Sequence, residues 1–378
     1  MQTFISLRAL CMNWKWIYLG ALCLLLMGVQ NLAAEEPPLT LSRPLIQKWL
    51  FEQGDPSANS PSFQGETLYA ESSSGVISAI LLRGGQLQWR SDVGGVLSAS
   101  PVADEQAVYV ASESVSGDSK KRQAMVMALS KTSGITIWSR ALVSPVQGRL
   151  LLQDKAILGA SKDGRVYSLD KATGELKWSR QYPFRFSGEW LLNNQRLIID
   201  AADGTIICVD SRTGEQLWRY RTQGSVRVAI AASGSKVFVG TAEGYLTALE
   251  ETGGGVIVRW RRRVGTSVVG VAHTIQGLVA ITGDNFVQLL SHRRGARLWK
   301  RRMPGRVWAQ PLTESRSALF ASLGGDDCIV LSLESGKQVN VVSVGEGNDI
   351  TAMPILTPKA LIIPTRRGLM AFGQPDAN

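Results

Sequence analysis

Residues 164–180 read GRVYSLDKATGELKWSR, and residues 204–219 read GTIICVDSRTGEQLWR. Each stretch runs from a glycine turn through an alternating apolar segment to a Thr-Gly turn and a segment that carries a tryptophan. The same frame recurs along the chain, with a degenerate copy at 328–342, where Asn340 stands in the place of the tryptophan. Because self-similarity at a fixed period marks a repeat architecture, this frame decides the fold.

The recurrent tryptophans follow one another at intervals close to forty residues. The intervals are 40, 49, 40, 40, 42 and 39 residues, and a polar insertion near residues 112–123 explains the long one. Each tryptophan is predicted to pack one repeat unit against the next, burying on the order of 200 Å². Gly174 and Gly214 are predicted to supply the positive φ of a tight hairpin. The tryptophans are Trp49, Trp89, Trp138, Trp178, Trp218, Trp260 and Trp299.

Each unit contains four short β segments, which glycine turns join and which alternate with a period of two residues. Four such strands form one antiparallel blade of a β-propeller. Seven units run from residue 59 to residue 343, and the tail at 349–373 supplies only three strands. The lone tryptophan segment Ile46–Phe51 supplies the fourth strand. The sequence therefore predicts an all-β, eight-bladed propeller whose last blade is closed by the N-terminal strand, with a seven-bladed ring as the alternative.

The predicted propeller spans residues 45–374, between a linker at 35–44 and a tail at 375–378. Residues 1–34 have the pattern of an export signal: a weakly basic start, an apolar run and a small-residue cleavage site after Ala34. An uncleaved anchor is the alternative. Cys23 lies inside the apolar run, so a lipoprotein signal is absent. We expect a Sec-exported periplasmic protein, peripheral to the outer membrane.

The formal net charge is +10, and in an exported protein it favours anionic lipid, glycan or an acidic protein face as a partner over nucleic acid. Outside the signal only two cysteines remain, Cys208 and Cys328. They lie in different repeats, so we expect them to be unpaired, buried thiols.

The motif V-Y-x-L-D-x-x-T-G-x-x-x-W at residues 166–178 resembles the pyrroloquinoline-quinone (PQQ) type of propeller repeat. Chain length, export signal and N-terminal strand closure are similar to those of the BamB family. That resemblance implies a monomeric, non-catalytic scaffold without a cofactor. Such a scaffold binds the outer-membrane β-barrel insertase and assists barrel assembly. No match to the Leu/Arg-bearing docking connector of that family is present, so no docking residues are carried over.

Quinone-dependent dehydrogenases share this repeat, so a PQQ-dependent enzyme is the first alternative and a ligand-sensing propeller is the second. The enzymes typically carry two adjacent cysteines, and no two cysteines of this chain are adjacent in the sequence. The acidic residues recur at equivalent turns of the repeat, which indicates that they stabilise the turns and do not form a single catalytic site. The two histidines, His273 and His292, lack a metal-like spacing. No catalytic or metal-binding residues are predicted.

Arginines cluster in the connections that follow the later units. Blade topology predicts that these connections lie on one face, where they would bind an acidic protein partner, since arginine suits such contacts. The alternative is a solvated rim whose arginines cover apolar surface. The candidates are Arg259, Arg261, Arg262, Arg263, Arg301, Arg302, Arg306, Arg366 and Arg367.

Overall fold

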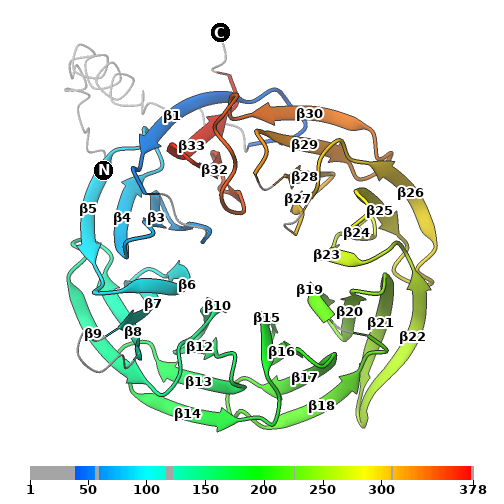
Figure 1. Ribbon diagram of the computed structural model, residues 1–378, viewed down its shortest axis with the longest axis horizontal. Coiled ribbons are helices and arrows are strands. Elements are labelled where there is room, and N and C mark those ends of the chain that lie inside the picture. Colours follow the sequence, from blue (N-terminus) through cyan, green and yellow to red (C-terminus); the bar gives the residue numbers. More distant parts are fainter. Residues whose placement is uncertain are drawn as a thin grey trace, which may run out of the picture. The chain divides into compact units, whose positions relative to one another are not determined.

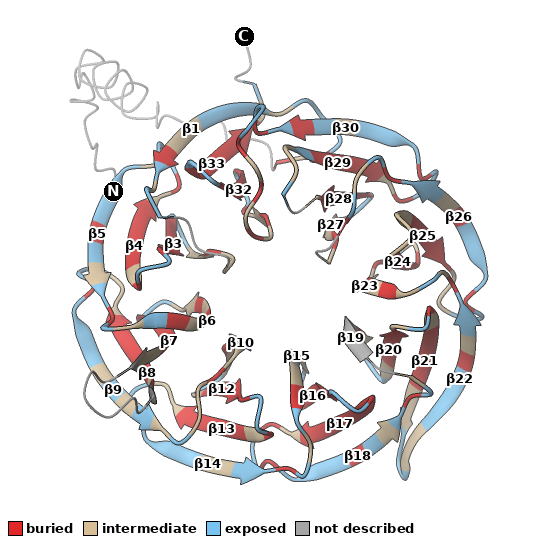
Figure 2. Cartoon of the chain, viewed as in Figure 1, coloured by how far each residue is buried: buried red, intermediate tan, exposed pale blue. Residues whose placement is uncertain are grey.

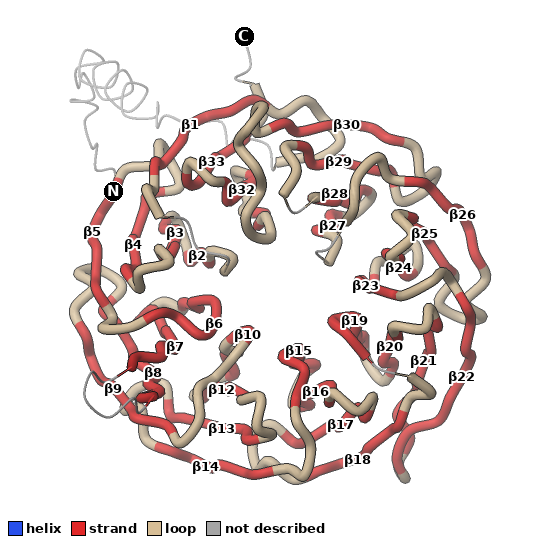
Figure 3. Tube along the Cα trace, viewed as in Figure 1, coloured by secondary structure: helices blue, strands red, loops and turns tan. Residues whose placement is uncertain are grey.

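Eight β-sheets surround a central axis in the computed structural model (Figure 1). The structure describes residues 39–55, 59–115, 122–224, 226–307, 310–322 and 324–375. Within these ranges there are strands, turns and loops but no helix (Figure 3). The prediction of an all-β, eight-bladed propeller closed by the N-terminal strand is confirmed. The predicted export signal at residues 1–34 lies outside the described residues.

The blades are numbered here in chain order, and their strands are given from the axis outward. Blade 1 contains β2 (Ser62–Gln64), β3 (Thr67–Glu71), β4 (Val76–Leu81) and β5 (Leu87–Asp92). Blade 2 contains β6 (Val96–Ala103), β7 (Ala107–Val115), β8 (Arg122–Ser130) and β9 (Thr136–Leu142). Blade 3 contains β11 (Leu151–Gln153), β12 (Ala156–Ala160), β13 (Arg165–Asp170) and β14 (Leu176–Gln181). Blade 4 contains β15 (Phe186–Asn193), β16 (Arg196–Ala201), β17 (Thr205–Asp210) and β18 (Gln216–Arg221).

Blade 5 contains β19 (Val226–Ser233), β20 (Lys236–Thr241), β21 (Tyr245–Thr252) and β22 (Gly255–Arg263). Blade 6 contains β23 (Val268–His273), β24 (Leu278–Thr282), β25 (Phe286–Leu290) and β26 (Arg297–Arg302). Blade 7 contains β27 (Leu312–Glu314), β28 (Ser317–Ala321), β29 (Asp327–Ser332) and β30 (Gln338–Ser343). Blade 8 contains β31 (Ile355–Leu356), β32 (Leu361–Thr365), β33 (Gly368–Gly373) and β1 (Ile46–Glu52). The remaining strand, β10 (Gly148–Arg149), pairs in parallel with β6.

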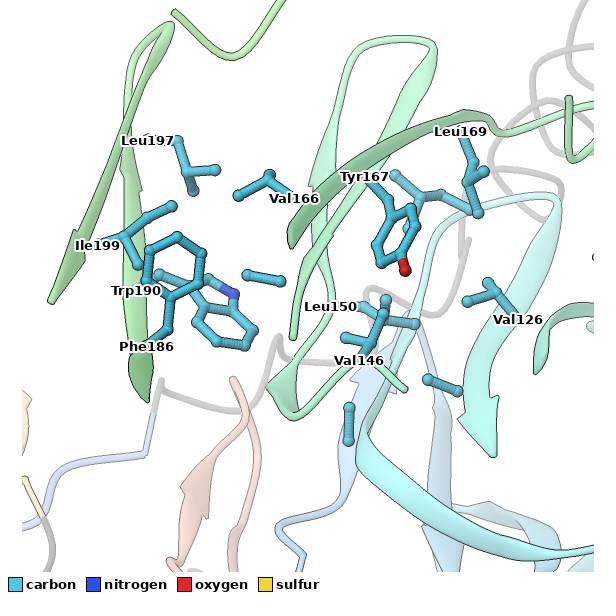
Figure 4. Close-up of a cluster of buried hydrophobic side chains, with 14 of the residues drawn as sticks. Val126, Val146, Leu150, Val166, Tyr167, Leu169, Phe186, Trp190, Leu197 and Ile199 are labelled. Carbon is cyan, nitrogen blue, oxygen red and sulfur yellow. The ribbon is translucent and has the colours of Figure 1, made fainter. Parts of the chain in front are cut away.

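The hydrophobic core lies between neighbouring blades. The middle strands are buried on both faces and are accordingly apolar, whereas the outermost strands are largely exposed (Figure 2). Between blades 2, 3 and 4, Val126, Tyr167 and Trp190 belong to one continuous cluster (Figure 4). Burial of such side chains contributes about 1.5–3 kcal/mol each.

The outer-strand tryptophans join adjacent blades through a repeated contact. The indole Nε1 of Trp138 donates to the carbonyl oxygen of Lys171 in the next blade, at 2.9 Å. The ring lies over Gly174, where a Cβ atom would be 2.4 Å from it. Since Gly174 also has a φ of 71°, glycine is required there for both space and backbone conformation. The ring also lies over a glycine of the next blade in the pairs Trp49 with Gly85, Trp89 with Gly134, Trp178 with Gly214, Trp260 with Gly295 and Trp299 with Gly336. All of these indoles except that of Trp178 also donate to a carbonyl oxygen of the next blade.

The ring is closed by β1, which pairs antiparallel with β33. Residues 39–44, expected to be part of a linker, pack against the propeller, and Leu41 is fully buried. The side-chain amide of Asn340 donates to the carbonyl oxygens of Leu41 and Arg43, at 3.0 and 2.6 Å. Because blade 8 is assembled from both chain ends, no glycine hairpin joins its outer two strands. This explains why Asn340 replaces the tryptophan in the degenerate unit.

Blade 5 replaces the tight Thr-Gly turn with a longer hairpin between β21 and β22. Here Trp218 of blade 4 donates to the carboxylate of Glu251 at 2.8 Å, instead of to a backbone carbonyl. The same carboxylate forms an ion pair with Arg196 at 2.5 Å, which compensates for its burial.

The prediction that Cys208 and Cys328 are unpaired is confirmed, and both are buried. Burial raises the pKa of each thiol to about 12. Both thiols are therefore protonated and unreactive at neutral pH.

Candidate protein-interaction surface

The arginines of the outer strands fall on two sides, because successive side chains of a strand alternate. An arginine that lies two residues after the tryptophan points to the same side of the strand as the indole, and its side chain reaches the next blade. Arg262 Nε donates to the carbonyl oxygen of Arg294 at 3.3 Å. Arg301 donates to the carbonyl oxygens of Gly336 and Ser335, at 2.9 and 3.0 Å. Arg140 and Arg180 make equivalent bonds in blades 2 and 3, so these arginines fasten blades together.

Cations at the first and third positions after the tryptophan lie on the opposite side. Blades 4, 5 and 6 carry a cation at both positions, and the other blades do not. The outer strand pairs with the third strand in the same register in all three blades. In each pair the last arginine of the outer strand lies opposite the first residue of the third strand, as Arg221, Arg263 and Arg302 do. We call this set the basic arc: Arg219, Arg221, Arg261, Arg263, Lys300 and Arg302.

Two members of the basic arc are held against aromatic rings. The guanidinium carbon of Arg261 lies 3.8 Å from the ring centroid of Tyr245, and Lys300 Nζ lies 3.6 Å from that of Phe286. Cation–π contacts of this kind position the charge without neutralising it. Arg261 also donates to the side chain of Gln223. The other four members are exposed, and within the described ranges no carboxylate forms an ion pair with any of the six.

Three acidic residues lie in the turns that precede the partner strands of the arc. Asp203, Glu243 and Asp284 occupy these turns in blades 4, 5 and 6. Asp203 accepts hydrogen bonds from the backbone and hydroxyl of Thr205. These carboxylates reduce the local positive charge, but the six cations outnumber them.

The other predicted arginines lie apart from the arc. Arg259 lies in the middle of β22, four residues before Arg263, and its charge is paired with Glu250 at 2.6 Å. Arg366 and Arg367 lie in the turn between β32 and β33 of blade 8, where they pair with Asp349 and Glu52. Arg306 is exposed and follows β26.

Sequence reasoning missed Arg219 and Arg221, which Tyr220 separates, because only consecutive basic residues were considered. The offset of each cation from the tryptophan is the signal that identifies them. Arg261 and Arg263 lie one and three residues after Trp260, so they point to the opposite side of the strand from Arg262, although all three are adjacent in sequence.

The two histidines lie together although their sequence spacing gave no hint of it. Their rings stack with centroids 4.5 Å apart, and His273 also stacks on Phe238 at 6.0 Å. Burial, then the nearby His292 and Lys236, lowers the pKa of His273. No group of three or more potential metal ligands occurs in the part of the chain that the structure describes.

Stability is expected to fall as the pH drops below about 6.5, the ordinary histidine pKa. His273 binds a proton less readily in the folded than in the unfolded state. Protonation below that pH therefore favours unfolding, until the folded-state pKa is passed. Urea unfolding at a series of pH values measures this. The variant His273→Phe should show a shallower loss of stability between neutral and mildly acidic pH, and an unchanged slope would contradict the assignment.

The four-stranded blades, each with a tryptophan or its substitute on the outer strand, define a propeller of the PQQ-repeat class. The family model described as outer membrane protein assembly factor BamB matches residues 73–185 and 202–361, well over half of the chain. The chain belongs to this family.

Three solved structures illustrate how widely the fold is shared. BamB from Moraxella catarrhalis has a TM-score of 0.70 at 16% identity, covering 89% of this chain and 99% of that one. The computationally designed protein Ika8 has a TM-score of 0.71 at 16% identity, covering 86% and 98%. Sqt1 from Saccharomyces cerevisiae has a TM-score of 0.72 at 12% identity, covering 86% and 98%. At these identities the likeness concerns the fold alone. The search of curated proteins returned no match.

Proposed function

We propose that this protein is a non-catalytic periplasmic scaffold that assists the assembly of outer-membrane β-barrel proteins by binding another protein. Family membership supports the assembly role, and the signal-like sequence at residues 1–34 supports export. The observation that carries the proposal is the basic arc, which three consecutive blades present in one register. Among the described residues, no helix is long and apolar enough to span a membrane.

The partner of the arc is an acidic protein face, and the barrel insertase is the candidate that the family suggests. Five of the six cations are arginines, whose planar guanidinium groups bind carboxylates with two hydrogen bonds. Binding by exposed charges of this kind is steered by long-range attraction and weakens as salt is added.

Reversing three exposed charges of the arc is expected to weaken partner capture by about tenfold at low salt. The variant is Arg221→Glu, Arg263→Glu and Arg302→Glu, which leaves the blade-fastening arginines intact. The measurement is in-cell crosslinking followed by identification of the captured protein, and pull-down over a range of salt concentrations. The matched control is Arg83→Glu, Lys155→Glu and Arg293→Glu, which makes the same charge change at exposed sites outside the arc. Equal capture by both variants would rule out the arc as the docking surface.

The enzymatic alternative is tested on the same purified protein. A quinone-dependent dehydrogenase would turn over an alcohol or sugar when supplied with calcium and pyrroloquinoline quinone. The scaffold proposal predicts no turnover and no quinone absorbance in the protein after removal of free cofactor.

A further inference from the structure

Arg261 lies at the centre of the basic arc and is held there by two neighbours. It extends from β22 of blade 5, the middle blade of the three that form the arc. Its guanidinium carbon lies 3.8 Å from the ring centroid of Tyr245, and its Nη1 donates to the side-chain oxygen of Gln223, in the connection between blades 4 and 5. Arg219, at the same position of blade 4, is exposed, and Thr205 stands where blade 5 has Tyr245.

A guanidinium group can stack on an aromatic ring and still bind a ligand in its own plane. Stacking on Tyr245 uses the flat face of the group, whereas its N–H donors point outward in the plane. One of these donors is bonded to Gln223, and among the described residues the other guanidinium N–H groups of Arg261 have no acceptor. A planar group of this kind suits a carboxylate, which accepts two parallel hydrogen bonds.

A side chain that is held in place before the partner arrives makes binding more favourable. A long side chain loses rotamer freedom when an interface orders it, and a side chain that is already ordered avoids most of that loss. Lys300 is held in a similar way in blade 6, where its Nζ lies 3.6 Å from the ring centroid of Phe286. An ammonium group is a point charge, however, and cannot form the paired bonds of a guanidinium.

We propose that Arg261 is the hot-spot residue of the basic arc, where it binds a carboxylate of the acidic partner, and that Tyr245 is its positioning residue. Residues that dominate an interface lie near its centre, and arginine and tyrosine are enriched among them. The partner therefore presents an aspartate or glutamate side chain to blade 5, while the cations of blades 4 and 6 add less directional attraction. This inference rests on the proposed docking function of the arc and adds the residue that selects the partner.

Two substitutions that keep the charge test the hot spot. The probe is fluorescently labelled poly-L-glutamate, and its binding to the full chain is followed by fluorescence anisotropy at low salt. Arg261→Lys should weaken binding by about five- to tenfold, because lysine cannot present two parallel donors. The matched control Arg219→Lys makes the same change at the exposed position of blade 4, and it should alter the Kd by less than about twofold. Equal effects of the two substitutions would overturn the inference.

A second pair of variants tests the positioning role of Tyr245. Tyr245→Thr introduces the residue that blade 4 has at this position, and it should weaken binding severalfold. Tyr245→Phe keeps the ring and should retain the native affinity. Because neither variant changes the charge of the arc, the dependence of the Kd on salt should be the same in both. A thermal melt establishes that each variant is folded, and native affinity in folded Tyr245→Thr would refute the positioning role.

The hot spot and the docking function of the arc fail in different ways. If the native chain does not bind poly-L-glutamate, the docking function is wrong and the hot spot is wrong with it. If the native chain and Arg261→Lys bind equally well, the arc remains a docking surface, but its affinity is spread over the six cations and the hot spot is refuted.

Discussion

A chain that begins at Gly54 is expected to lose the cooperative unfolding transition that a chain beginning at Leu39 retains. The missing residues contain β1, the outer strand of blade 8, and the buried side chains of Leu39, Leu41 and Phe51. Burial of three such side chains contributes roughly 5–9 kcal/mol. That is comparable to the whole stability of a typical domain, about 5–15 kcal/mol.

Circular dichroism during thermal unfolding measures the difference between the two chains. Both lack residues 1–38, so that segment does not enter the comparison. A synthetic peptide covering residues 39–53 should restore the transition when it is added to the shorter chain, because β33 keeps the complementary edge. Equal melting of both chains without the peptide would show that the ring does not depend on its closing strand.

The substitution Gly174→Ala is expected to destabilise the protein by about 2–3 kcal/mol. A non-glycine residue at a φ of 71° costs roughly 1–2 kcal/mol. The new methyl group would also lie 2.4 Å from the indole of Trp138, so the ring must move. Its hydrogen bond to the carbonyl oxygen of Lys171 is then lost, at a further cost of about 1 kcal/mol.

The control Gly234→Ala separates these two causes. Gly234 also has a positive φ, of 58°, but nothing lies within 4 Å of its added Cβ atom. We expect urea unfolding to show a loss of about 1–2 kcal/mol for this variant, from the backbone alone. If both substitutions cost the same, the tryptophan–glycine contact contributes nothing measurable to the joining of blades.

Most of the fold follows from one periodic feature of the sequence. The tryptophan spacing identifies the blades, and the lone Trp49 segment correctly indicates that the N-terminal strand completes the eighth. Periodicity is informative here because each blade must fill the same space between two neighbours. The exception, Asn340, became understandable only when the structure placed it against residues 41 and 43.

The surface was less predictable because exposed residues are not constrained by packing. Adjacent arginines looked like one cluster in the sequence. Because side chains alternate along the strand, Arg262 points to the next blade and bonds to it, whereas Arg263 points to the opposite side and is exposed. The stacked histidines depend on a contact between the end of β23 and the turn after β25, at positions where the other blades have no histidine. No local pattern encodes such contacts.

The pairing of the first strand with the last also governs when the molecule can finish folding. Glu52 and Arg367 are in contact across 315 residues of sequence, so the closing contacts have a very high contact order. Each of blades 1 to 7 can assemble from a continuous segment as the chain emerges, but blade 8 must wait for residue 373. An interrupted chain therefore keeps β1 without its partner strand and leaves one apolar face of its last complete blade uncovered. An unpaired strand and exposed apolar surface both promote aggregation.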